Sequence, residues 1–348
     1  MTESPPAATL DEVRALLAEL PGPDLAAATA VATREAQLTK PPGSLGRLEE
    51  LTLWLAQWQG RHPPRVEHAR VAVFAGNHGV AERGVSAYPA SVTQQMVQNF
   101  IAGGGAVNQL AGLADADLRV YELALEEPTA DFTRGPAMEE EDCARAIAYG
   151  MLAVENGFDV LALGEMGIAN TTSGAALCLA LFGGTAEDWV GRGTGVDDAG
   201  LDRKRTAVTE ALEANREILT DGQGRIEPFE ALRCLGGLEL SAIVGAVLAA
   251  RLAGTPVILD GFTCCAAAAV LHAADPRALD HCVVAHRSAE SGHGRLLEAI
   301  GKAPLFDFAL RLGEASGAAL ALPILRAAAA CHAGMATFSD AGVSGPDA

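Results

Sequence analysis

The stretch Asp159-Val160-Leu161-Ala162-Leu163-Gly164-Glu165-Met166-Gly167 is a short apolar strand that ends in a glycine turn. Ile168-Ala169-Asn170-Thr171-Thr172 then leads into a helix expected over 175–181. The same order of strand, turn and small-residue helix recurs along the chain, with apolar strands expected at 70–75, 118–123, 256–259 and 282–285. Continuous apolar strands that alternate with helices predict a parallel sheet covered on both faces. Ligands bind such sheets beyond the carboxyl ends of the strands.

The two ends of the chain show helical periodicity in place of alternating strands and helices. Helical periodicity covers 10–20 and 45–58, and the chain returns to helices from about Pro304 to Phe338. We therefore expect a large α/β domain over 66–303. We expect a small helical domain formed by 1–65 together with 304–348.

Composition narrows the classes of partner. The 348 residues carry a net charge of -19, which argues against nucleic acid as a partner. An acidic protein must bind a phosphate locally, with backbone N–H groups and one or two placed cations. The chain has neither an apolar run of membrane-span length without a charge or helix breaker nor a basic and apolar leader at its start. These features predict a soluble, cytoplasmic protein.

The cysteines and histidines do not form a recognisable metal motif. The seven cysteines are scattered, mostly within apolar runs, which is typical of reduced structural thiols. Cys282, His286 and His293 are the only loose cluster, and their spacing fits no standard zinc site. We expect neither a metal nor a cofactor.

Two glycine-rich segments have the chemistry of anion sites. In 164–173, N-cap residue types open a helix whose N-terminus can bind an anion, although an ordinary cap would have the same residues. The segment 191–198 resembles a dinucleotide loop, but Val196 stands where the third glycine is expected. A phosphate cradle with Lys204 as its counter-charge fits better, and no P-loop motif is present.

Glu314 lies between Gly313 and Gly317, just before an apolar run. Apolar neighbours raise the proton affinity of a carboxylate, which suits a general base. The alternative is an ordinary acidic residue in the first turn of a helix, where the macrodipole favours it. Its local sequence taken alone favours the helical interpretation.

The loop after the first strand of the large domain contains Tyr88, which either lines a flat ligand pocket or anchors the loop. His78, in the same loop, is expected to form a structural hydrogen bond because no nucleophile lies beside it.

Seven ordered segments together resemble the nicotinate-nucleotide–dimethylbenzimidazole phosphoribosyltransferase (CobT) family of cobalamin biosynthesis. The resemblance spans about 38–343 and is carried by Lys40-Pro41-Pro42-Gly43-Ser44-Leu45-Gly46-Arg47-Leu48-Glu49, His78-Gly79-Val80 with Gly84-Val85-Ser86-Ala87-Tyr88-Pro89, 164–172, 191–204, Leu259-Asp260-Gly261-Phe262, Ser288-Ala289-Glu290 and 313–320. Ala315 stands where glycine is common in the family, and Asn77 where aspartate is common.

The resemblance implies a three-layer α/β/α fold with a mostly parallel, Rossmann-like sheet, a small helical region from both termini, and a homodimer. It implies transfer of phosphoribose from nicotinate mononucleotide to a benzimidazole base, with the general base at Glu314. The expected substrate-binding residues are Glu165, Met166, Gly167, Asn170, Thr171, Gly193, Lys204, Ser288, Leu312, Gly317 and Tyr88. Another phosphoribosyl transferase or nucleosidase, a nucleotide-dependent oxidoreductase and a non-catalytic binding protein are the alternatives.

Overall fold

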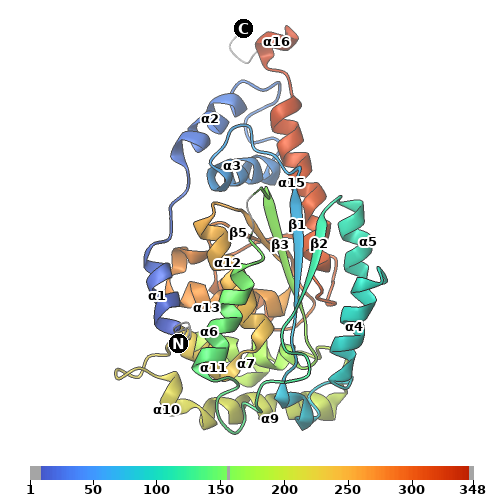
Figure 1. The fold of residues 1–348 in the computed structure, drawn as a ribbon. Helices are drawn as coiled ribbons and strands as arrows, with labels where there is room; N and C mark the ends of the chain where they lie inside the picture. The colour runs from blue at the N-terminus through green and yellow to red at the C-terminus, as the bar shows by residue number, and fades with distance from the viewer. Residues whose placement is uncertain (1–8, 155–156, 345–348) are drawn as a thin grey trace, which may run out of the picture.

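The computed structural model of the chain describes residues 9–154 and 157–344 (Figure 1). Its centre is a six-stranded, all-parallel sheet in the order β2-β1-β3-β4-β5-β6. The strands are β1 (Ala69–Ala75), β2 (Asp117–Glu122), β3 (Val160–Met166), β4 (Val257–Leu259), β5 (Cys282–His286) and β6 (Pro304–Phe306).

The α-helices begin with α1 (Leu10–Ala18), α2 (Leu25–Glu35), α3 (Arg47–Gln59), α4 (Ser91–Ile101), α5 (Ala106–Leu113), α6 (Glu140–Met151), α7 (Asn170–Phe182) and α8 (Ala186–Trp189). They continue with α9 (Asp198–Ala214), α10 (Arg216–Leu219), α11 (Pro228–Leu235), α12 (Leu238–Leu252), α13 (Phe262–Ala274), α14 (His293–Ala299), α15 (Ser316–Gly334) and α16 (Phe338–Ala341). Two 3-10 helices are η1 (Gly79–Arg83) and η2 (Pro276–Leu279).

The sheet is the middle layer of three. Every residue of β1 is buried, and its side chains alternate between two cores: Ala72 and Phe74 point to one, Val71 and Val73 to the other. Helices α12 and α13 pack on the first face, and α15 and α5 on the second. The predicted three-layer α/β/α fold with a parallel sheet is confirmed.

The strand order reverses between β1 and β3, because β2 lies on one side of β1 and all later strands lie on the other. A reversal of this kind leaves a crevice at the carboxyl ends of the two strands, which is where open α/β sheets bind ligands. The segments that follow β1 and β3, predicted to be chemically important, lie at this edge.

Two local expectations are corrected. Pro304–Phe306 pairs with β5, so the chain does not return directly to helices at Pro304. Helix α7 begins at Asn170 and not near residue 175, because Ala169 takes a left-handed conformation and is itself the N-cap. The segment before Gly191 is the short helix α8, and this agrees with the rejection of a dinucleotide loop.

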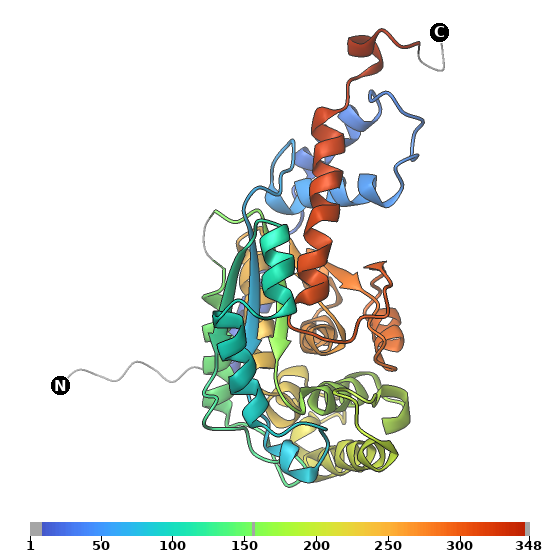
Figure 2. The same cartoon turned by 90° about the vertical axis from the view of Figure 1, so that its right-hand side faces the viewer.

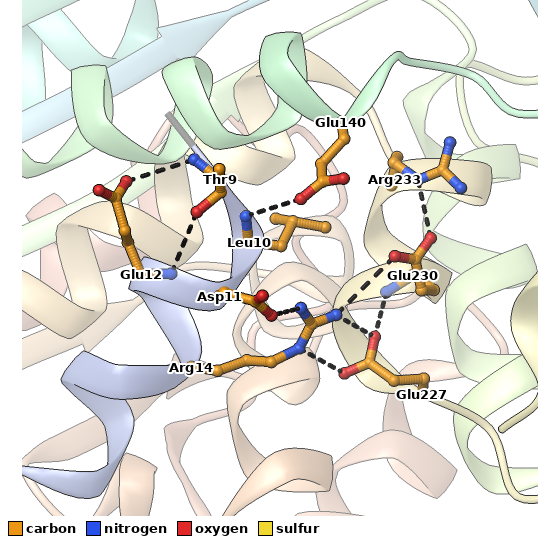
Figure 3. Close-up of polar contacts among 9 residues, drawn as sticks. All are labelled: Thr9, Leu10, Asp11, Glu12, Arg14, Glu140, Glu227, Glu230 and Arg233. Atoms are coloured by element: carbon orange, nitrogen blue, oxygen red, sulfur yellow. Dashed lines mark hydrogen bonds and ion pairs between the residues drawn. The ribbon is translucent and has the colours of Figure 1, made fainter. Parts of the chain in front are cut away.

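Helix α1 is fixed to the large α/β part of the molecule (Figure 3). Thr9 and Glu12 form a capping box at its start, and the Leu10 backbone N–H donates to Glu140 of α6. Arg14 pairs with Glu227 at the start of α11 and lies 3.8 Å from Glu230. These contacts hold α1 beside α6 and α11, apart from α2 and α3 (Figure 1).

Helices α2 and α3 lie beside the carboxyl-terminal half of α15 (Figures 1 and 2). A buried polar network joins them: His332 of α15 contacts Glu35 of α2 at 2.6 Å, and Lys40 pairs with both Glu35 and Glu49. The division into a domain 66–303 and a helical domain of 1–65 with 304–348 stays a prediction.

Helix α15 is the one helix of the described residues that is long and apolar enough to cross a membrane. Half of it is buried inside the protein, where it packs against β1, β3, β5 and α3. This burial is typical of the core helix of a globular protein.

Helices α6 and α12 cross at very close range because each presents a glycine to the other. A Cβ atom on Gly245 would overlap the Ile147 carbonyl oxygen, and one on Gly150 would overlap that of Ala242. Both obstacles are backbone atoms, which cannot move aside as a flexible side chain can.

We predict that Gly245→Ala lowers the free energy of unfolding by about 1 to 3 kcal/mol, the usual cost of overpacking a core. The matched control is Gly112→Ala in α5, where an added Cβ meets nothing within 4 Å. Alanine is the better helix former, so the control should be neutral or slightly stabilising. Urea unfolding of both variants measures the difference, and equal stabilities would contradict the prediction.

Candidate active site

Four polar side chains lie at or just beyond the carboxyl ends of neighbouring strands. His78 follows β1, Glu165 lies near the end of β3, Asp260 follows β4 and His286 ends β5. All four are buried. Since parallel strands end at the same edge, the fold gathers them under the turn that carries Glu314.

The turn 313–315 packs directly on β3. Gly313, Glu314 and Ala315 all have positive φ, at 82°, 63° and 59°. The Glu314 N–H donates to the Glu165 carbonyl oxygen at 3.0 Å. The left-handed conformation costs an L-residue about 1 to 2 kcal/mol, so the surrounding contacts must hold Glu314 in place.

The turn 313–315 can pack this closely on β3 because Gly164 has no side chain. A Cβ atom at residue 164 would overlap the backbone N and Cα of Ala315. Helix α15 begins only at Ser316, after this turn, so Glu314 does not lie in the first helical turn. The prediction that Glu314 lies in the first turn of a helix is therefore wrong.

Glu314 and Glu165 both have a pKa above the ordinary value of a glutamate. Burial, together with the negative charge of Asp260, raises the pKa of Glu314 to about 7. Burial also raises the pKa of Glu165 to about 8, and the neighbouring Glu239, Asp260 and Glu314 raise it further. The Asn170 amide donates to Glu165 and opposes this rise.

Lys204 and Thr171 form a second, cationic part of the site. The Lys204 ammonium is almost fully buried and donates to the Thr171 hydroxyl at 2.9 Å. Burial lowers the pKa of Lys204 to about 8, while Glu290 acts in the opposite direction. An added anion would stabilise the charged form of this lysine, and α7 begins beside it without a side-chain cap.

The loop 191–195 closes over this lysine. Gly193 has φ 52°, and a Cβ atom there would lie 2.6 Å from the Thr171 hydroxyl and 2.9 Å from the Lys204 ammonium. The Gly193 N–H donates to Glu290, and Arg311 donates to the Gly193 carbonyl oxygen. The backbone therefore approaches the cation closely, as a phosphate cradle requires.

Ser288 lies on the β5 side of this loop. Its hydroxyl accepts from the Glu290 N–H, and its own N–H donates to His293 at 2.8 Å. Burial lowers the pKa of His293 to about 3, which keeps this ring neutral and able to accept. Ser288 thereby supports the segment that carries Glu290.

The residues expected to line a base pocket differ in exposure. Tyr88 and Leu312 are 55% and 57% exposed, whereas Met166 is half-buried against the core below α4. The Tyr88 loop is tied to the cradle, because Ser86 and the Ala87 N–H both contact the Thr194 hydroxyl at 3.1 Å.

Gly167 and Gly317, the other glycines expected to bind substrate, both lie very close to neighbouring atoms of the protein. A Cβ atom on Gly167 would lie 2.8 Å from the Gly76 carbonyl oxygen and 3.0 Å from a Glu239 oxygen. A Cβ atom on Gly317 would overlap His286 and lie 2.8 Å from Asp260.

Glu239 was not identified from the sequence. It is the second residue of α12, fully buried, and its carboxylate lies 2.6 Å from Nε2 of His78. The expected structural hydrogen bond of His78 is therefore present. The signal available was an acidic residue at the start of an otherwise apolar helix, which is costly to bury without a partner.

No group of three or more His, Cys, Asp or Glu side chains within 9–154 and 157–344 could hold a metal ion.

A cavity of about 550 Å³ lies between the end of β2, the 124–138 loop and α6. None of the predicted site residues lines it.

Comparisons of the sequence and the fold with known proteins identify the family of this chain. The family model described as "Phosphoribosyltransferase" matches residues 20–343. A curated relative from Sinorhizobium medicae, named nicotinate-nucleotide–dimethylbenzimidazole phosphoribosyltransferase, is 56% identical, with 96% of this chain and 97% of the relative covered. A relative of the same name from Brucella canis is also 56% identical, with the same coverage.

The crystal structure of CobT from Thermus thermophilus superposes with a TM-score of 0.85 at 44% identity, covering 91% of this chain and 99% of that one. A second structure from the same organism, titled with the full name of the enzyme, gives a TM-score of 0.84 at 43% identity, covering 92% of this chain and 99% of that one. The chain belongs to the nicotinate-nucleotide–dimethylbenzimidazole phosphoribosyltransferase family.

The raised pKa of Glu165 predicts a pH-dependent stability. An unfolded glutamate ionises near pH 4.5, whereas the folded group keeps its proton to about pH 8. Above pH 4.5 the folded state binds more protons, so stability is lost as pH rises. Glu165→Gln should therefore gain stability relative to the parent between pH 5 and pH 8, by about 1 kcal/mol per pH unit.

Urea unfolding at several pH values measures this difference. The control is Glu213→Gln, since Glu213 is exposed on α9. A Glu165→Gln curve parallel to the parent curve would show that the folded carboxyl ionises normally.

Proposed function

We propose that the protein transfers phosphoribose from nicotinate mononucleotide to 5,6-dimethylbenzimidazole. The products are α-ribazole 5′-phosphate, for the lower nucleotide loop of cobalamin, and nicotinate. The observation that carries the proposal is the pair of buried carboxyl groups, Glu314 and Glu165, joined through the backbone at the carboxyl edge of the sheet. The family membership supplies the substrates.

Glu314 is the proposed general base. The attacking benzimidazole nitrogen gains positive charge unless the other ring nitrogen loses its proton. A carboxylate with a pKa of about 7 is well matched to accept that proton near neutral pH. The left-handed turn holds the Glu314 backbone on β3 before substrate arrives, which reduces the ordering required for reaction.

Glu165 is proposed to face the ribose. Breaking the bond to nicotinate gives an oxocarbenium-like sugar, and attack from the opposite face converts the β to the α anomer. Glu165 keeps its proton near pH 7, and a positive charge that develops on the adjacent sugar would favour its ionised form.

Lys204, Thr171, Gly193 and Asn170 are proposed to hold the 5′-phosphate, with Ser288 supporting the cradle from β5. The buried ammonium beside the hydroxyl supports this assignment, because burial disfavours its charged form and a phosphate would stabilise it. Gly167 and Gly317 are proposed to let the backbone approach the nucleotide.

Tyr88, Met166 and Leu312 are proposed to form the pocket for the benzimidazole ring. The exposure of Tyr88 and Leu312 leaves apolar surface free at the mouth of the site. We also propose that the protein acts in the cytoplasm as a homodimer, as the resemblance to the family implies.

One assay tests the reaction. The purified protein is incubated with nicotinate mononucleotide and dimethylbenzimidazole, and both nicotinate and ribazole phosphate are quantified. Equal amounts of the two products are expected. Nicotinate release without ribazole phosphate would indicate a nucleosidase, and ligand binding without turnover would indicate a non-catalytic protein.

Replacing the proposed base should abolish most of the turnover. We predict that Glu314→Gln keeps the fold and binds both substrates but lowers kcat by roughly 10² to 10⁴, the usual contribution of a general base. Steady-state kinetics with binding measured by calorimetry separates the two effects. Turnover close to that of the parent would remove Glu314 from the mechanism.

Removing the cation should weaken one substrate selectively. Lys204→Ala should raise the Kd of nicotinate mononucleotide about tenfold or more while leaving that of dimethylbenzimidazole nearly unchanged, since charge-assisted bonds to an anion are lost. Arg205→Ala is the control, because Arg205 lies on the same helix and pairs with Asp202. Equal losses for both substrates would argue against phosphate binding by Lys204.

A further inference from the structure

Helix α15 begins without a capping side chain of its own. Its N-cap is Ala315, which has no side-chain oxygen to offer to the first N–H groups. Asp260, from the end of β4, supplies the missing acceptor: its Oδ1 accepts from the Ala318 N–H at 2.9 Å. The cap of α15 therefore comes from a different strand, 58 residues away in the chain.

The contact is buried and closely fitted. Asp260 is 1% exposed, and its Oδ1 also lies 3.6 Å from Nε2 of His286 at the end of β5. Gly317 leaves the necessary space, because a Cβ atom there would overlap His286. The other oxygen of Asp260, Oδ2, has no hydrogen-bond partner among the described residues.

Asp260 thus acts on the residue that carries the proposed chemistry. The cap fixes the start of α15, and Glu314 lies two residues before that start. From these contacts we infer that Asp260 is a positioning residue for Glu314: it anchors the turn 313–315 and places a fixed negative charge beside the Glu314 carboxyl group. This inference rests on the proposed function of Glu314.

The electrostatics agree with the geometry. The acidic groups that interact electrostatically with Glu314 are Glu165 from β3 and Asp260 from β4, and His286 from β5 lies beside Asp260. After burial, the charge of Asp260 is the cause that raises the pKa of Glu314. A base must be unprotonated to act, so kcat/KM should rise with pH through the pKa of Glu314.

Asp260→Asn separates the two roles. The amide keeps an oxygen acceptor for the Ala318 N–H but removes the charge, so the Glu314 pKa should fall. The acidic limb of the kcat/KM profile should then move to lower pH by about one unit, the usual effect of one nearby charge. Asp260→Ala loses the cap as well and should lower kcat at every pH. Asp24→Asn is the matched control, since Asp24 caps α2 through Ala27.

The result that overturns the inference is an acidic limb of Asp260→Asn that coincides with that of the parent, since Asp260 would then be only a structural cap. Asp260→Ser, a second neutral cap residue, repeats the test if the amide variant does not fold. If neither neutral variant folds, the charge is needed for the fold itself and the assignment is wrong.

A measurement without turnover distinguishes this inference from the proposed function. The Glu314 carboxyl carbon is followed by ¹³C NMR in protein labelled at glutamate, with Glu314→Gln identifying the signal. Its titration midpoint should be lower in Asp260→Asn than in the parent. Absence of turnover in the parent would contradict the proposed function, whereas an unchanged midpoint would contradict the role of Asp260.

Discussion

The close packing of the turn 313–315 on strand β3 is the constraint on which the site depends. Gly164 has no side chain, so the Ala315 backbone can lie directly against the strand. The Glu314 N–H then reaches the Glu165 carbonyl oxygen, and two carboxyl groups from distant parts of the chain share one buried region. Their low exposure explains why both hold protons at pH values where surface glutamates are ionised.

Much of the fold could be predicted because its signals are local. The apolar runs 70–75 and 159–163 and the glycine-containing segments that follow them indicate a parallel sheet with its ligands at one edge. Strand β3 itself continues through Gly164 to Met166. The strand β6 was missed because three half-buried residues carry no periodicity that a sequence pattern could detect. The start of α7 was misplaced because left-handed Ala169, a residue with no cap side chain, serves as its N-cap.

The site was harder to predict, because its chemistry depends on pairs that are remote in sequence. Lys204 and Thr171 could each be identified as anion-binding types, but their contact requires α9 to pack against α7. The role of Asp260 could not be derived, since its partner Ala318 offers only a backbone N–H. For Glu314 the local sequence favoured a residue in the first turn of a helix, and the structure contradicts this because Gly313, Glu314 and Ala315 are left-handed and α15 begins only at Ser316.

Helix α15 has a mechanical consequence for the molecule. Its 19 residues span about 28 Å. It leaves the carboxyl edge of the sheet beside Glu314 and passes the start of β1, where Arg326 donates to the Val66 carbonyl oxygen. At its far end it meets α2 through His332. Helices α2, α3 and α16 thus lie at the opposite edge of the sheet from the site (Figure 2). Helix α15 is the continuous element that joins them to the turn that carries Glu314.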